Sequence, residues 1–190
     1  MIPLSDSFDD AHDDFPPPGP VVRPMESRDA WGMTAMLQRY TRAGLTGDQF
    51  MAMKERLENF IPKALVDVQP GGKISGFAIA ATQAGNFANP RGILKIMTSP
   101  EFDRAESTKR LLRGIARQIM ATGQTTLELV VSDDDEVLKD VCKLYQANCV
   151  KMASPSGDFP ALNSHVFVIS DLTRHFGIKP RQDQPKDPSP

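Results

Sequence analysis

The segment 91–121 constrains the fold most, because it predicts a strand, a tight turn and a helix in succession. The apolar run 92–98 has the length of a strand. Pro100 cannot continue a ladder, and the serine and aspartate around it favour a turn and a helix cap. From Arg104 onwards, apolar pairs recur every four residues, which predicts one buried face of a helix, at 111/112, 115/116 and 119/120. The free N–H groups at the start of such a helix favour an anion.

Length and composition indicate a globular chain. The 190 residues suffice for one domain with a full core. Hydrophobic residues make up 40% and charged residues 24%, and the net charge of -2 gives no strong signal for a nucleic-acid partner. The N-terminus lacks the basic and apolar regions of a signal peptide, and no apolar run approaches membrane-spanning length. We therefore expect neither secretion nor a membrane partner.

The two cysteines indicate a compartment. Cys142 and Cys149 are seven residues apart and belong to no metal-binding motif. This pattern predicts two buried thiols in a reducing environment, the cytoplasm, and not a disulfide or a metal site.

Both ends of the chain differ in composition from the middle. Residues 1–20 contain five aspartates, no lysine or arginine, and a proline-rich stretch at 16–20. They predict a disordered acidic leader, serving either as an interaction arm or, as we favour, as a solvating tail. Residues 174–190 are proline-rich and mildly basic, which predicts a flexible tail. The predicted domain is 21–173.

The remaining pattern supplies further elements. We expect a strand at 21–24, a helix capped by Ser27 or Asp29, and a second helix opened by the segment 46–49. Two strands, 64–69 and 73–82, flank a Pro-Gly-Gly turn, which is typical of a hairpin. A strand at 125–131, a helix running through Leu138, Leu144 and Tyr145, and strands at 149–153 and 165–169 complete the order.

Two clusters have both a functional and a structural interpretation. Methionines on the first two helices, which are Met33, Met36, Met51 and Met53, form either an adaptable binding surface or core, and we favour core. The acidic run 132–136 suggests a metal or a capped helix terminus. We favour capping, because the sequence offers no second ligand cluster, and we expect no metal.

This order of elements resembles that of the GCN5-related N-acetyltransferase (GNAT) fold over residues 21–172. The opening Val22, Arg23 and Pro24 is similar to the start of many such proteins, and Leu144 and Tyr145 before a strand resemble their late helix. The resemblance implies a single α/β domain, a mixed twisted sheet flanked by helices. It also implies acetyl-CoA as cofactor and transfer of its acetyl group to an amine that the sequence does not identify.

The resemblance also implies a set of site residues. Tyr145 takes the place of the family's general acid, with a half-buried core tyrosine as the alternative. The thioester carbonyl would rest on backbone N–H groups near Met97 and Ser99. The phosphates would meet a cationic cluster that could equally be a solvated helix face: Arg104, Lys109, Arg110 and Arg113. No general base stands out, and Glu128 is either one or a surface residue.

The cofactor loop departs from the family pattern. Where the family has Arg/Gln-x-x-Gly-x-Gly/Ala, residues 103–108 place Glu106 and Thr108 at the two glycine positions. Glycines allow close backbone approach to a pyrophosphate, and Glu106 adds a repulsive charge there. The late helix departs as well, since Cys149 and Val150 replace the usual Gly-Phe, and the usual asparagine is replaced near Leu138. Any binding of coenzyme A is therefore expected to be weak.

These departures support a second hypothesis from another class. The chain would then be a binding or structural protein on a GNAT-like scaffold, with a protein partner, and it resembles internal virion proteins of short-tailed bacteriophages in having a degraded cofactor loop. A virion would then replace the cytoplasm as its location. Binding of acetyl-CoA distinguishes the two hypotheses.

Overall fold

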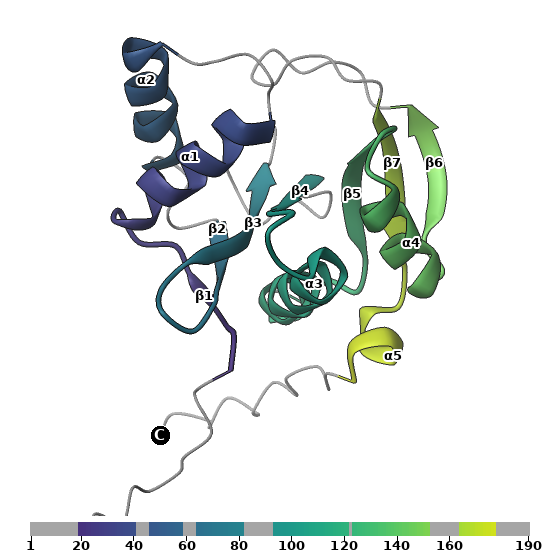
Figure 1. Cartoon of the computed structure of the whole chain (residues 1–190). Helices are drawn as coiled ribbons and strands as arrows, with labels where there is room; N and C mark the ends of the chain where they lie inside the picture. Colours follow the sequence, from purple (N-terminus) through teal and green to yellow (C-terminus); the bar gives the residue numbers. More distant parts are fainter. Residues whose placement is uncertain are drawn as a thin grey trace, which may run out of the picture.

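One mixed sheet organises the domain (Figure 1). The computed structural model describes residues 19–40, 46–58, 64–81, 93–121, 123–152 and 164–177. The strands are β1 (Val21–Pro24), β2 (Ala64–Val68), β3 (Ile74–Ala81), β4 (Ile93–Thr98), β5 (Leu127–Ser132), β6 (Asn148–Met152) and β7 (Ser164–Ile169). The helices are α1 (Asp29–Tyr40), α2 (Gly47–Glu58), α3 (Arg104–Met120), α4 (Glu136–Leu144) and α5 (Leu172–Phe176).

The sheet has the order β1-β2-β3-β4-β5-β7-β6. Neighbouring strands are antiparallel except β4 and β5, which are parallel and connected through α3. A parallel pair requires a crossover of this kind. The element order and the mixed α/β sheet are those expected from the sequence, and the hairpin turn is present, with Gly71 and Gly72 at φ values of 86° and 81° that favour glycine.

The parallel pair β4–β5 is short. Its ladder contains two residue pairs, Ile93 with Glu128 and Leu94 with Leu129. On the other side, β4 pairs with β3 along its whole length, up to Thr98 opposite Gly76. The two parallel strands therefore stop pairing well before their carboxyl ends.

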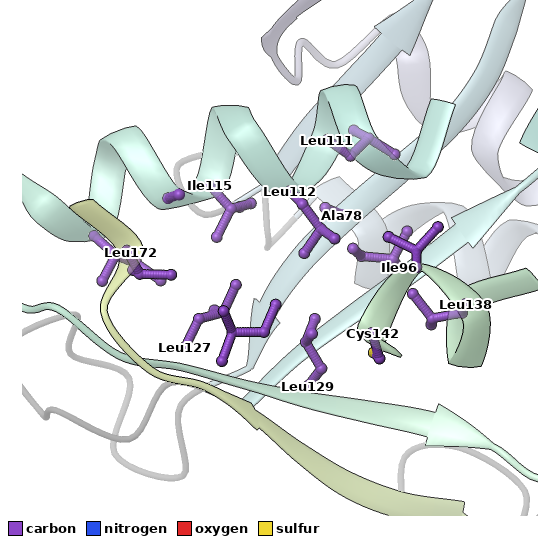
Figure 2. Packing of buried hydrophobic residues seen from close by; sticks show 14 of the residues in the cluster. Ala78, Ile96, Leu111, Leu112, Ile115, Leu127, Leu129, Leu138, Cys142 and Leu172 are labelled. Atoms are coloured by element: carbon purple, nitrogen blue, oxygen red, sulfur yellow. The ribbon is translucent and has the colours of Figure 1, made fainter. Parts of the chain in front are cut away.

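The helices divide between the two faces of the sheet. α3, α4 and α5 cover one face, where Leu112 and Ile115 of α3 point towards the β5 leucines, Leu127 and Leu129 (Figure 2). α1 and α2 cover the other face, over Phe77 and Ile79. Because side chains alternate along a strand, β3 contributes to both cores, as its nearly continuous apolar sequence predicts.

α3 packs closely on the sheet at two glycines. A Cβ at Gly76 would lie 2.8 Å from Ser107 Oγ and 2.9 Å from the Met97 carbonyl oxygen. A Cβ at Gly114 would lie 2.9 Å from Leu65 Cδ1 and 3.0 Å from Val22 Cγ1. Glycine at these positions lets the start of α3 lie close to β3 and β4, and the middle of α3 lie close to β1 and β2.

The helical caps and the methionines largely agree with the sequence. Asp135 caps α4 by accepting the Leu138 N–H, as capping chemistry in the run 132–136 predicts. Met33 and Met36 are buried and Met53 is half-buried, which supports the core interpretation. Met51 is exposed and does not belong to that core.

The solvent exposure of two side chains differs from what the sequence indicated. Cys142 is buried, but Cys149 is exposed, because β6 is an edge strand with a bulge after this residue. Leu144 is exposed as well, since α4 points Leu138 and Val141 inwards and turns the next leucine away.

α5 crosses the domain boundary expected at 173. Its Phe176 packs on the hydrophobic core beneath α3, so the helix extends into the segment assigned to the tail. The predictions for residues 1–18, for the loops within 82–92 and 153–163, and for 178–190 lie outside the described residues.

Candidate functional site

β4 and β5 are not paired at their carboxyl ends, and this unpaired part of the sheet is called the opening below. The Ser99 N–H donates to the Ser75 carbonyl of β3 at 2.7 Å. Because successive N–H groups point to opposite sides of a strand, those of Ile96 and Thr98 point away from β3 and towards β5. Since the β4–β5 ladder ends at Leu94, these two N–H groups have no ladder partner on β5. The opening thus presents a short, unpaired strand edge.

α3 begins beside this opening, but its N-terminus already carries a carboxylate. Asp103 is the N-cap, and its Oδ1 accepts the Glu106 N–H at 3.1 Å. The Asp103 side chain therefore takes the place that an anion would occupy at a helix N-terminus. Glu106 adds a second, exposed carboxylate in the same turn. A bound phosphate has to displace one negative charge and lie near another.

Arg104 connects the ends of the two parallel strands. Its Nε donates to Thr98 Oγ1 at 3.1 Å, at the last residue of β4. Its Nη2 donates to Asp135 Oδ1 at 2.9 Å, at the N-cap of α4 just beyond β5. This candidate phosphate ligand is therefore engaged within the chain.

Arg110 is also engaged, in a buried polar cluster beneath α3. Its guanidinium donates to both carboxylate oxygens of Asp67, which is fully buried on β2. The hydroxyls of Ser75 and Ser107 donate to Asp67 Oδ2 at 2.8 and 2.6 Å. The hydrogen bond with Asp67 raises the pKa of Arg110. Asp67 carried no signal in the sequence except as a lone acid in an apolar strand.

Lys109 pairs with the residue that replaces the first glycine. Its Nζ lies 2.7 Å from Glu106 Oε1, and this hydrogen bond raises the pKa of the lysine. Thr108, which replaces the second glycine, is buried. Three of the four cations predicted to bind phosphate, Arg104, Lys109 and Arg110, thus have carboxylate partners.

Met97 and Ser99 lie at the end of β4, as expected. Met97 is opposite Phe77 and packs on the α1–α2 core. The Ser99 N–H is bonded to β3 and is not available for an oxyanion. The N–H groups that the structure leaves towards the opening are those of the neighbouring Ile96 and Thr98.

Tyr145 follows α4 as its C-cap. Its ring centroid lies 4.7 Å from Phe176 and 6.0 Å from His175, both on α5. Burial raises the pKa of its phenol, while the charges of Arg113 and Lys109 on α3 oppose that rise. Within the described residues, its ring and charged neighbours thus come from α3 and α5. Glu128 is half-buried on the sheet face opposite Leu127 and Leu129, the direction predicted from the alternation.

One acid–histidine pair was not anticipated. His165 Nδ1 of β7 lies 2.6 Å from Asp133 Oδ1, just beyond β5. The contact lacks hydrogen-bond geometry, and this oxygen, itself buried, accepts no other hydrogen bond within the described residues. Strand pairing of Val131 with His165 brings the two together, which the sequence spacing does not reveal.

The described residues contain no group of three or more His, Cys, Asp or Glu that could hold a metal ion. None of the described helices is long and apolar enough to cross a membrane.

Solved structures share this arrangement. An N-acetyltransferase from Staphylococcus aureus superposes with a TM-score of 0.62 at 16% identity, covering 82% of this chain and 99% of that one. The chain has the GNAT fold. A GNAT phosphinothricin acetyltransferase from Sinorhizobium meliloti, solved with AcCoA, also gives 0.62, at 14% identity over 90% of this chain and 97% of its own.

The GNAT fold is recognised here through structure alone. Diaminobutyrate acetyltransferase from Paenibacillus lautus, in complex with its substrate and coenzyme A, gives 0.59 at 16% identity over 80% of this chain and 95% of its own. The sequence matches no protein-family model and no curated protein. The likeness therefore lies in the fold and not in the sequence.

Proposed function

We propose that this protein is an N-acyltransferase that transfers an acetyl group from acetyl-CoA to an amine. The opening between β4 and β5 carries this proposal. The N–H groups of Ile96 and Thr98 face it without a strand partner. The pantetheine arm of coenzyme A contains amide groups. These can hydrogen-bond to an unpaired strand edge in the way that an added β-strand does. The fold supports the proposal, because the S. meliloti protein was solved with AcCoA.

The residues fit the cofactor unevenly. The strand edge suits the pantetheine arm, and the start of α3 faces the same opening. The phosphate end fits poorly, because Asp103 and Glu106 place carboxylates at the helix N-terminus. We therefore expect weak binding, with the strand edge supplying more of the affinity than the cations.

Acetyl-CoA would supply a thioester for attack by the amine, and the chain would supply donors. An N–H of Ile96 or Thr98 would hydrogen-bond to the carbonyl oxygen as negative charge develops on it. Tyr145 would donate a proton to the departing sulfur, for which its phenol is in the protonated form at neutral pH, since burial raises its pKa. The amine would form a bond to the carbonyl carbon as the C–S bond breaks, and its proton would pass to solvent.

A non-catalytic GNAT scaffold is the second candidate. The pairing of Arg104, Lys109 and Arg110 with Asp135, Glu106 and Asp67 favours it, because three of the four cations expected to hold phosphate are neutralised within the chain. On this hypothesis, the opening is part of the fold, but no reaction takes place there.

Calorimetry with acetyl-CoA on the full chain separates the candidates. Binding, together with thiol release in the presence of an amine panel, supports the acetyltransferase. In that case Tyr145→Phe should abolish turnover and leave the dissociation constant unchanged. The absence of binding at millimolar acetyl-CoA would instead favour the scaffold. Binding with turnover that persists in Tyr145→Phe would keep the enzyme and remove this tyrosine as its acid.

A further inference from the structure

Arg104 is the first residue of α3, and its side chain joins three segments that are distant in the sequence. It reaches back to Thr98 at the end of β4 and across to Asp135 at the start of α4. Asp135 belongs to the connection that follows β5, 31 residues from Arg104. The arginine therefore spans the carboxyl ends of the two strands where their ladder is missing.

Both partners of Arg104 are held in place. Thr98 is buried, with 3% of its surface exposed. Asp135 Oδ1 also accepts the Leu138 N–H at 3.0 Å, so the cap of α4 fixes the oxygen that Arg104 contacts. The side chains of Arg104 and Asp135 are 28% and 21% exposed, so the ion pair is partly shielded from water. A planar guanidinium with two fixed acceptors forms a rigid connection.

The position of this connection bears on ligand access. A linear ligand can hydrogen-bond to the N–H groups of Ile96 and Thr98 and then extend to the start of α3. Such a ligand has to pass the side chain of Arg104. Moving that side chain breaks two hydrogen bonds from the guanidinium, one of them to a carboxylate.

We propose that Arg104, through Thr98 and Asp135, fastens the ends of β4 and β5 and opposes the binding of acyl-CoA. This inference rests on the proposed function for the identity of the ligand. It reverses the role expected from the sequence, in which Arg104 holds the phosphates. Arg104 is a positioning residue in this scheme, because it acts through the strand ends.

The direction in which Arg104→Ala changes the affinity for acetyl-CoA tests the proposal. Acetyl-CoA is titrated into the full chain and into Arg104→Ala, Arg104→Lys and Asp135→Asn. We expect Arg104→Ala to bind about tenfold more tightly, the ratio that loss of one charge-assisted hydrogen bond implies. Asp135→Asn keeps a good helix cap while weakening the ion pair, so it should tighten binding as well. Weaker or unchanged binding in Arg104→Ala would overturn the proposal and make the arginine a ligand or a bystander.

Amide hydrogen exchange gives a readout that needs no ligand. We expect faster exchange at Leu94, the last β4 residue in the ladder with β5, in Arg104→Ala and Asp135→Asn than in the parent chain. Arg39→Ala is the matched control, since Arg39 forms an exposed ion pair with Glu101 in the turn before α3. Its loss should leave exchange at Leu94 unchanged.

The two readouts separate failure of the inference from failure of the proposed function. If acetyl-CoA binds to none of the variants, the proposed function fails and exchange decides the inference alone. Faster exchange limited to the Arg104 and Asp135 variants supports the fastening of the strand ends. Exchange that is unchanged in both variants overturns it, whatever the binding data show.

Discussion

Arg110 donates two hydrogen bonds to the buried carboxylate of Asp67, from Nε to Oδ1 at 3.0 Å and from Nη2 to Oδ2 at 2.7 Å. The pair joins the first turns of α3 to β2, and Ser75 and Ser107 complete the set of donors around Asp67. A charge this deeply buried requires such partners. The position of Arg110 is therefore explained by folding without reference to a cofactor.

We expect Arg110→Ala to destabilise the domain by about 3–5 kcal/mol, because it leaves the carboxylate of Asp67 buried and without its cation. Denaturant unfolding at pH 7 measures the effect. Lys109→Ala is the matched control on the same helix, since its ion pair with Glu106 is exposed, and it should change stability little. Equal stability of the two variants would contradict the structural role of Arg110.

The inward face of α3 predicts a second difference. Leu112→Ala and Ile115→Ala should each cost about 2–5 kcal/mol in the free energy of unfolding, because both side chains are almost fully buried in the core beneath α3. Arg113 is exposed on the same helix, and Arg113→Ala should have little effect. Similar unfolding midpoints for all three variants would show that the helix faces the sheet differently.

Cys142 predicts a pH dependence. Burial raises the pKa of its thiol from 9.0 to about 12. Between these values the unfolded chain loses the thiol proton while the folded chain keeps it, so stability falls as pH rises, by roughly 1.4 kcal/mol per pH unit from this group. The contribution of the buried thiol is complete below pH 9.

Unfolding measured from pH 8 to pH 11 tests this slope. Cys142→Ala should unfold with a shallower alkaline loss than the parent chain. Cys149→Ala is the control, because Cys149 is exposed and its removal should leave the slope as it is. Identical slopes for the parent chain and Cys142→Ala would indicate that water reaches the thiol.

The next prediction concerns trimming of the two chain ends, with the C-terminal boundary now placed after α5. We expect a protein trimmed to residues 19–177 to melt within a few degrees of the full chain, in line with the composition of the two ends. Ending the chain at 173 should lower the melting temperature further, because Phe176 then no longer packs on Tyr145. A large loss on trimming to 19–177 would show that the ends pack on the domain.

Restoring the glycines of the cofactor loop tests its chemistry. Glu106→Gly with Thr108→Gly should tighten or create acetyl-CoA binding by about tenfold, a gain near 1.4 kcal/mol, since it removes a charge and frees the backbone. Each glycine lowers helix stability by about 1 kcal/mol, so binding is compared at a temperature where both proteins are folded.

Glu106→Ala is the control for that experiment, because it removes the charge and keeps a Cβ. If it matches the double variant, repulsion and not backbone access limits binding. If calorimetry shows no binding after the glycines are restored, the likeness to the acetyltransferases ends at the fold.

The elements were predictable where the signal is local. The spacing of Leu111, Leu112, Ile115 and Ala116 follows the helical period, so the buried face of α3 could be read directly. The glycine turn and the caps follow from the conformational preferences of single residues. The exposure of Leu144 was missed, because it depends on how a short helix is rotated against its neighbours.

The candidate site was predictable in place but not in its interactions. The sequence placed Arg104, Lys109 and Arg110 in the first turns of the helix that follows β4, and they lie there. It did not reveal their partners. Lys109 finds Glu106 within its own helix, but Arg110 finds Asp67 43 residues away and Arg104 finds Asp135 31 residues away.

The sequence by itself thus determined the strands, the helices and the residues that face the core, because hydrophobic period and turn chemistry act over a few neighbouring residues. Only the tertiary structure decided that Arg104, Lys109 and Arg110 are neutralised and that the ends of β4 and β5 are not paired. Ion pairing depends on which strands lie beneath a helix, and that arrangement follows from packing of the whole sheet. A helix rich in arginine predicts a charged surface, whereas the carboxylates it meets come from β2 and from the start of α4.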